Sequence, residues 1–151
     1  MKKIYLLGAV SLLLFSCKTD DDNEINISSI VANWKFSKAE VISGSNNTVL
    51  YSETIVGCDA NTTFEFKNDG KYAIRYFLEQ NNQCQFDYED AWLYNYDQTA
   101  QTIVTKRSNS SHTEMYKVEK LNDYELVLFL YDDYDQNNDG IEDKNVYYLH
   151  K

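Results

Sequence analysis

From residue 25 to the end of the chain, apolar and polar residues alternate along short segments separated by clusters of Asn, Asp, Gly and Ser. Because successive side chains of a β-strand point to opposite faces of a sheet, this period of two predicts strands with one buried face. No segment has a convincing period of 3.6 residues, so we expect an all-β domain with little helix. The expected strands cover residues 33–42, 48–56, 62–66, 72–78, 89–96, 102–106, 114–120, 124–131 and 145–150.

The turns between these segments depend on Asn, Asp, Gly and Ser, because the chain contains no proline. The strongest hairpin signal is Lys67-Asn68-Asp69-Gly70, which lies between two alternating segments. Short connections favour pairing between neighbouring strands, and thus an antiparallel meander of about eight strands. Closure into a barrel would remove the exposed strand edges. A β-sandwich is the alternative, since the alternating pattern fits both architectures.

The first residues have the layout of a secretory signal. After the basic Met1-Lys2-Lys3, the apolar run over residues 4–15 has twelve residues, too few to cross a hydrocarbon core of about 30 Å. The following Leu14-Phe15-Ser16-Cys17 resembles the lipobox of bacterial lipoproteins, in which the Cys receives a diacylglycerol thioether before cleavage. The resemblance implies a signal peptide over residues 1–16 and a lipid on Cys17, which would anchor the protein to a membrane.

Residues 17–29 would then form an acidic tether, because a run of like charges such as Asp20-Asp21-Asp22 repels itself and builds no core. The segment also resembles the acidic export signal that follows the lipidated Cys in surface lipoproteins of Bacteroidota. This resemblance implies an outer-membrane location, with the domain of residues 30–151 exposed at the cell surface.

The chain is acidic, with a formal net charge of −10. Removal of residues 1–16 would leave 12 basic and 24 acidic side chains. Such a surface repels phosphate backbones, so nucleic-acid binding is not expected. It suits cations or neutral ligands, although an acidic surface also serves solubility alone.

Two cysteines remain once Cys17 carries lipid. Cys58 and Cys84 are separated by 26 residues in turn-like sequence, and disulfides persist in the oxidising compartment that a secretory signal implies. Closing a loop of that size would contribute roughly 3–4 kcal/mol in the chain-entropy view. A thiolate metal site is the alternative, but two sulfurs with no nearby histidine cannot complete a zinc shell. We therefore predict a Cys58–Cys84 disulfide.

Several short motifs follow one another along the chain: Ile30-Val31-Ala32-Asn33-Trp34, Cys58 before Thr62-Thr63-Phe64-Glu65-Phe66, the hairpin at 67–72, Cys84, Trp92 and Tyr124-Glu125-Leu126-Val127-Leu128. Taken in this order, they resemble the lipocalin-like domain of small Bacteroidota lipoproteins. The resemblance covers residues 30–151 and implies an eight-stranded barrel whose interior holds a small hydrophobic molecule. Two positions depart from lipocalins: Ala32 replaces a Gly, and the arginine that packs on the first-strand Trp is missing from the end, Leu149-His150-Lys151.

Aromatic and apolar residues on the expected strands are candidates for lining such a cavity. The alternative is that the same residues fill the core of a small closed barrel. The candidates are Trp34, Phe64, Phe66, Tyr72, Ile74, Tyr76, Trp92, Tyr94 and Tyr96.

The loop before the last expected strand contains a pattern typical of calcium loops. Asp135, Asn137 and Asp139 place oxygen ligands at positions 1, 3 and 5, a glycine follows at position 6, and Asp143 stands at position 9. Val146 occupies the position where an EF-hand needs Glu, so the pattern resembles the truncated calcium loops of thrombospondin-type repeats. Ca²⁺ is the one cofactor that the sequence suggests. An ordinary soluble loop is the alternative.

No catalytic constellation is evident. His112 and His150 lie far apart without ligand-spaced partners, and no G-x-S-x-G motif is present. We therefore expect no enzyme, but a lipid-anchored outer-membrane lipoprotein whose barrel binds a small hydrophobic ligand. The alternative is a surface structural or interaction module, stabilised by calcium, without a small-molecule ligand. The sequence identifies no protein partner.

Overall fold

The computed structural model describes residues 30–108, 110–131 and 134–151. The predicted signal peptide, the predicted lipidation site at Cys17 and the predicted tether lie outside the described residues. No helix in the described part of the chain is long and apolar enough to cross a lipid bilayer. The described elements are β1 Ala32–Ile42, β2 Val49–Thr54, the 3-10 helix η2 Asp59–Asn61, β3 Thr63–Phe66, β4 Lys71–Gln80, β5 Gln83–Asp97, β6 Thr102–Arg107, β7 Thr113–Leu121, β8 Glu125–Tyr131 and β9 Lys144–His150.

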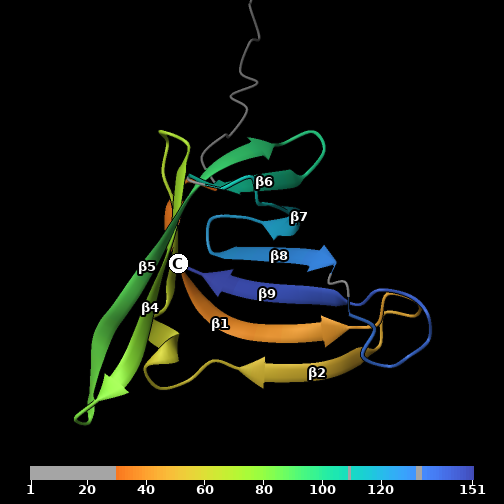
Figure 1. Ribbon diagram of the computed structural model, residues 1–151, viewed down its shortest axis with the longest axis horizontal. Helices are drawn as coiled ribbons and strands as arrows, with labels where there is room; N and C mark the ends of the chain where they lie inside the picture. Colours follow the sequence, from red (N-terminus) through yellow and green to blue (C-terminus); the bar gives the residue numbers. More distant parts are fainter. Residues whose placement is uncertain (1–29, 109, 132–133) are drawn as a thin grey trace, which may run out of the picture.

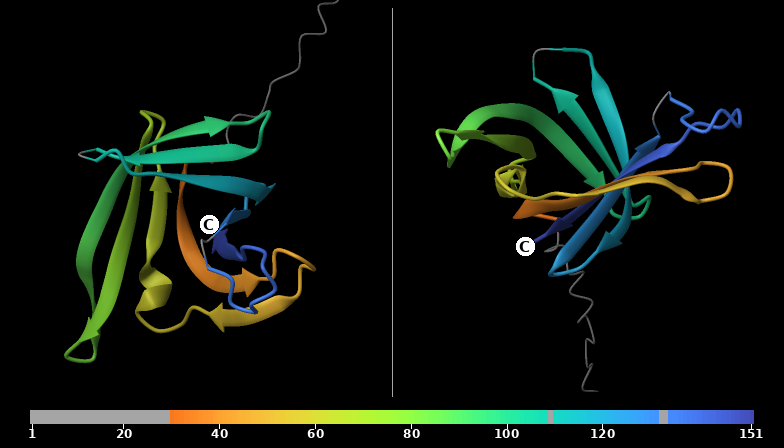
Figure 2. Two further views of the ribbon diagram at one scale, coloured as in Figure 1. Left: turned by 45° about the vertical axis from the view of Figure 1, so that its right-hand side comes forward. Right: turned by 90° about the horizontal axis from the view of Figure 1, so that it is seen from below.

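The strands form one closed antiparallel sheet (Figures 1 and 2). The order runs β1, β3, β4 and onward to β9, and β9 pairs again with β1, from Lys35 opposite His150 to Ile42 opposite Lys144. Strand β2 lies along the second half of β1, beside the ring of eight, while β3 pairs with the first half. The predicted all-β meander barrel is thus confirmed.

The β4–β5 hairpin is longer than the sequence analysis predicted. Strand β5 begins at Gln83 rather than near residue 89, and Gln80 pairs with Gln83 across a two-residue turn. Asn81 and Asn82 both have positive φ, +54° and +58°, as a type I′ hairpin turn requires. The polar composition of this turn hid the strand that follows it. In both views of Figure 2 the hairpin, drawn in green, curves out from the rest of the barrel.

A disulfide joins Cys58 to Cys84, with 5.1 Å between their Cα atoms. Cys58 occupies the N-cap position of η2, without a capping bond from its side chain, whereas Cys84 lies within β5 and not in a turn. The bond therefore ties the protruding part of the β4–β5 hairpin to the segment that enters β3. The predicted pairing of these two cysteines is confirmed.

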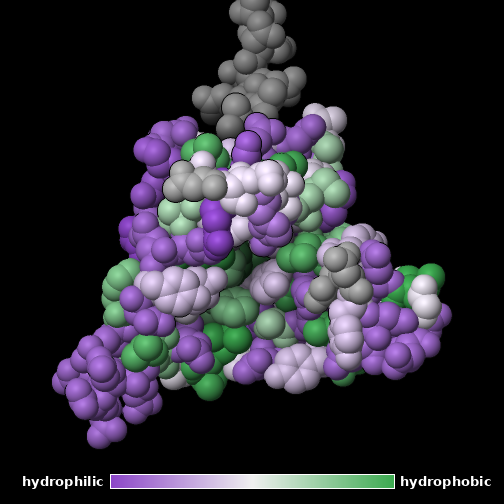
Figure 3. All heavy atoms as spheres, in the orientation of Figure 1, coloured by the Kyte–Doolittle hydropathy of each residue, from purple (hydrophilic) through white to green (hydrophobic). Residues whose placement is uncertain are grey.

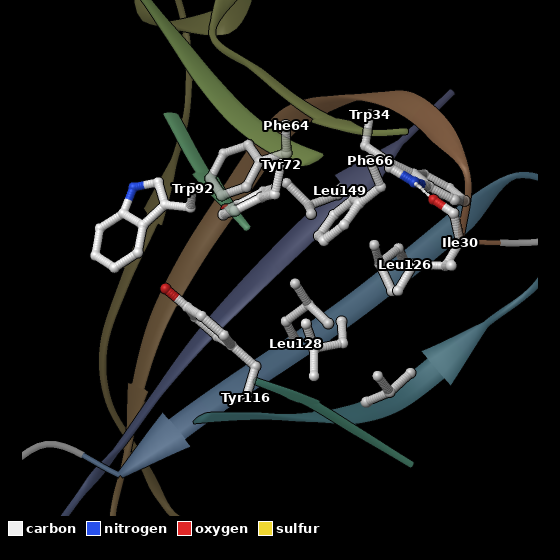
Figure 4. Packing of buried hydrophobic residues seen from close by; sticks show 12 residues of the cluster. Ile30, Trp34, Phe64, Phe66, Tyr72, Trp92, Tyr116, Leu126, Leu128 and Leu149 are labelled. Atoms are coloured by element: carbon white, nitrogen blue, oxygen red, sulfur yellow. Dashed lines mark hydrogen bonds between the residues drawn. The ribbon is translucent and has the colours of Figure 1, made fainter. Parts of the chain in front are cut away.

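One end of the barrel is packed around Trp34, which is completely buried. Its indole Nε1 donates a hydrogen bond to the Ile30 carbonyl at 2.9 Å, and the Nζ of Lys151 lies 4.6 Å from the ring centroid. A cation at the end of the chain thus stacks on this Trp, although the sequence has no arginine there. Figure 4 shows Trp34, Ile30 and Leu126 together at this end of the cluster.

Candidate functional site

The other end of the barrel contains a pocket of about 320 Å³. It lies between the β4–β5 hairpin on one side and strands β7, β9 and β1 on the other, and most of its wall is aromatic. Figure 3 shows a hollow in this part of the molecule, with hydrophobic side chains at its floor. The lining residues are Phe36, Thr62, Phe64, Ile74, Tyr76, Asp90, Trp92, Glu114, Tyr116 and Tyr147.

The structure separates the predicted lining residues into two groups. Phe64, Ile74, Tyr76 and Trp92 line the pocket. The others belong to the packed part of the barrel or border it: Trp34, Phe66, Tyr72, Tyr94 and Tyr96. Aromatic contacts join the two groups, since Phe64 and Tyr72 have ring centroids 6.3 Å apart.

Two carboxylates lie in the pocket wall. The Tyr116 hydroxyl donates to Oε2 of Glu114 at 2.5 Å, and Nε2 of His112 lies 3.4 Å from Oε1 of the same carboxylate. Asp90 accepts a hydrogen bond from Nη2 of Arg107 at 2.6 Å through Oδ2. Burial, and then the bond to Glu114, raise the pKa of Tyr116 far above its ordinary value.

Two tyrosines of the pocket, Tyr76 and Tyr116, have a raised pKa and stay neutral at physiological pH. Burial raises the pKa of Tyr76 to about 12, with a further contribution from Tyr88. The Tyr76 and Tyr88 rings stack at 4.5 Å between centroids, so the protruding hairpin supports this wall of the pocket. The phenols therefore offer aromatic faces and hydroxyl groups to a ligand, but no negative charge.

Trp92 has an unusual polar environment for a buried indole. Its side chain is 7% exposed, and the guanidinium carbon of Arg107 lies 4.9 Å from the ring centroid. Nε1 is buried and has no hydrogen-bond partner within the described residues. An unpaired buried donor costs free energy, so a ligand acceptor that reached this N–H would supply a bond that the protein does not make.

Comparison with known proteins assigns the fold to a family. A family model described as the lipocalin-like domain matches residues 30–128. The chain belongs to the lipocalin-like domain family. Comparison with curated proteins gives no match.

Three solved lipocalin-type structures are similar to this lipocalin-like domain. Bovine odorant binding protein, as a deswapped triple mutant, is 12% identical over 82% of this chain and 72% of that chain, with a TM-score of 0.40. A dog lipocalin allergen is 8% identical over 81% and 73% of the two chains, with a TM-score of 0.39. Aphrodisin, a sex pheromone from female hamster, is 12% identical over 80% and 73%, with a TM-score of 0.38.

Several lining residues of the lipocalin-like pocket were not among the sequence candidates. Asp90 and Glu114 are polar, but each lies two residues from a buried aromatic residue of the same strand, Trp92 and Tyr116. The period of two places such neighbours on the same face of the sheet, so it could have indicated both acids. The other lining residues outside the candidate set are Phe36, Thr62, Tyr116 and Tyr147.

The loop with the calcium-like pattern is tied to the β1–β2 turn by its own acids. Asp143 is 1% exposed and accepts hydrogen bonds from the backbone N–H groups of Gln136 at 2.7 Å and Gly44 at 3.3 Å. Asp139 accepts from the Ser45 hydroxyl at 2.5 Å. The approach is close, because a Cβ on Gly44 would lie 2.0 Å from the Glu142 carbonyl oxygen. These acids therefore hold two loops of the barrel together.

The remaining calcium candidates lie in the same loop. Asp135 accepts the N–H groups of Asp139 and Gly140 through its two oxygens, and the Asn137 amide donates to Asp139 at 2.8 Å. Within the described residues, no group of three or more His, Cys, Asp or Glu side chains is placed to hold a metal ion. Calcium binding stays a prediction. We expect a Ca²⁺-dependent rise in melting temperature that Asp139→Ala abolishes, and equal melting with calcium and chelator would contradict it.

Proposed function

We propose that the barrel binds a small hydrophobic ligand in the pocket at its open end. The observation that supports this is the cavity of about 320 Å³ with walls of Phe, Tyr, Trp and Ile side chains. Ligand pockets are concave, largely apolar and carry a few polar groups, and this volume lies at the small end of their range of about 300–1,000 Å³. Membership of the lipocalin-like family supports a binding role rather than catalysis.

The test fills the pocket without touching its polar groups. A larger side chain in Ile74→Trp would occupy the cavity, so the affinity for the fluorescent hydrophobe N-phenylnaphthylamine should fall at least about tenfold. Val104→Trp makes a comparable change at an exposed position of β6 and serves as the matched control. Fluorescence titrations use the full chain in a mild detergent, with detergent-only titrations subtracted. Probe binding that survives in Ile74→Trp, or no binding by the wild type, would contradict the proposal.

We further propose that a lipid on Cys17 anchors this binding domain to the outer membrane of a Bacteroidota-type bacterium, facing outward. The support is the lipobox-like Leu14-Phe15-Ser16-Cys17 after a basic and apolar leader, followed by an acidic run. Mass spectrometry of the mature protein should find a diacylated Cys17 as the first residue. Cys17→Ser should accumulate with residues 1–16 attached, and a wild-type protein that retains them would contradict the anchor. Protease treatment of intact cells tests the outward orientation, because only a surface-exposed domain is cleaved.

A further inference from the structure

The charges in the pocket wall all have the same sign. Among the ten lining residues two are acids, Asp90 and Glu114, and none is Lys, Arg or His. Both carboxylates are partly accessible, with side-chain exposures of 26% for Asp90 and 32% for Glu114. A ligand in the pocket therefore meets negative charge. An anionic ligand such as a fatty acid would be repelled there.

A neutral hydrophobic ligand would leave the two pocket carboxylates without a partner of opposite charge. A ligand that covers a carboxylate removes it from water, which costs free energy unless the ligand supplies a hydrogen-bond donor or a positive charge. Glu114 receives one bond from Tyr116 and lies 3.4 Å from Nε2 of His112, and Asp90 receives one bond from Arg107, so each carboxylate retains acceptor capacity for a ligand. The guanidinium of Arg107 always carries a charge that offsets Asp90, whereas His112 is charged only when protonated, so Glu114 is the stronger attraction for a cation.

The aromatic walls favour the same ligand charge. Cations are attracted to the faces of Trp and Tyr rings within about 6 Å of the centroid. Trp92 already accepts such a contact from Arg107 on its ring. Tyr76, Tyr116 and Tyr147 line the same space as the two carboxylates. An ammonium group beside Glu114 would gain a charge-assisted hydrogen bond and lie among aromatic rings.

On the basis of the proposed pocket function, we propose that the ligand is a small aromatic or apolar molecule that carries a protonated amine. Glu114 is the principal partner of the ammonium group, and Asp90 contributes less because Arg107 already pairs with it. The apolar body of the ligand packs against Phe36, Phe64 and Ile74.

Three probes with the same aromatic body test the charge preference: naphthylethylamine, naphthylethanol and naphthylacetate. Isothermal titration of the full chain in detergent should show the amine binding at least about tenfold more tightly than the alcohol, and the acetate binding most weakly. In Glu114→Gln, which keeps an acceptor for Tyr116, amine affinity should fall about tenfold while alcohol affinity changes less than about twofold. Asp90→Asn should show a smaller loss of amine affinity.

A variant at the protein surface distinguishes attraction of the amine by the pocket carboxylates from attraction by the overall negative charge of the protein. Asp123→Asn removes the same charge in the turn between β7 and β8, outside the pocket lining, and should leave all three affinities unchanged. Unfolding midpoints verify that each variant is folded. Equal binding of amine and alcohol, or equal losses in Glu114→Gln and Asp123→Asn, would overturn the cation preference and leave the pocket function standing. Absence of binding by all three probes would overturn both proposals.

Discussion

The barrel contains two buried tryptophans in opposite settings. Each has a cation over its ring, Lys151 over Trp34 at 4.6 Å and Arg107 over Trp92 at 4.9 Å. Trp34 donates its N–H to the Ile30 carbonyl, whereas the N–H of Trp92 has no partner within the described residues. Figure 4 places them at opposite ends of the hydrophobic cluster.

The difference separates a packed end that stabilises the barrel from an open end at which we propose that a ligand binds. Trp34 is completely buried and donates its N–H within the protein, so this end leaves no indole donor for a ligand. Around Trp92 the wall keeps an unpaired donor, two partly accessible carboxylates and a cavity of about 320 Å³. A buried donor or acceptor without a partner lowers the stability of the fold. A ligand that supplies the missing partner binds more tightly for that reason. The packed end therefore stabilises the barrel, and the open end is where the proposed ligand would gain contacts.

The sharpest test of this division is truncation of each indole. Trp34→Ala should lower the free energy of unfolding by about 3–5 kcal/mol, because the packed end cannot collapse around the lost volume. Trp92→Ala should lower it by about 1–2 kcal/mol, since the gap joins an existing pocket that water can fill. Denaturant unfolding measures both losses. Trp34→Phe is the milder variant if Trp34→Ala does not fold, and equal losses at the two sites would contradict the comparison.

The second test concerns the disulfide that braces the open end. Replacing both cysteines in Cys58→Ser/Cys84→Ser should lower the free energy of unfolding by about 2–4 kcal/mol, because the unfolded chain gains freedom over a 26-residue separation. Reduction of the wild type should reproduce the loss measured by denaturant. A loss below about 1 kcal/mol would show that the β4–β5 hairpin holds its place without the bond.

The third test compares the pocket carboxylates with Glu40, a carboxylate that receives several hydrogen bonds from the protein. Glu40 in β1 is 7% exposed. Burial acts to raise its pKa, but hydrogen bonds from Lys38, Tyr148 and Ser52 outweigh burial and hold the pKa below its ordinary value. A carboxyl with a lower pKa in the folded state binds fewer protons there, so it stabilises the fold above the unfolded pKa, and this contribution is lost as pH falls.

Glu40→Gln should therefore lower the free energy of unfolding by about 1–2 kcal/mol at neutral pH. The difference from the wild type should be complete above about pH 5 and shrink as the medium is acidified through the carboxyl range. Unfolding curves across this pH range measure it. A difference that stays constant, or grows in acid, would show that Glu40 acts through packing and not through its charge.

The sequence predicted the barrel well because alternation and turn residues are local signals. The hairpin at Lys67–Gly70 was found from such signals. The Cys58–Cys84 pair followed instead from the cysteine count and from the oxidising compartment that a secretory signal implies. The extension of β5 back to Gln83 was missed because the polar turn at Asn81 and Asn82 masked its start, although Cys84, Phe86 and Tyr88 alternate with polar residues. The division of aromatic residues into packed and pocket-lining sets was also inaccessible, because it depends on how distant strands meet across the interior. The period of two could have placed Asp90 and Glu114 on the inner face, but only the arrangement of the strands shows that they line one pocket.

The smallest expected change in stability comes from removing the two cations that lie over the tryptophan rings. Lys151→Met keeps most of the apolar stem and removes the charge over Trp34, so it should lower the free energy of unfolding by about 0.5–1 kcal/mol.

Arg107→Met removes the charge over Trp92 and also frees Asp90 from its ion pair. We expect it to change stability less than about 0.5 kcal/mol, since exposed pairs contribute little. It should instead strengthen binding of naphthylethylamine, because the pocket becomes more negative. If Arg107→Met weakened amine binding, the guanidinium would be part of the binding site and not a competitor for its negative charge.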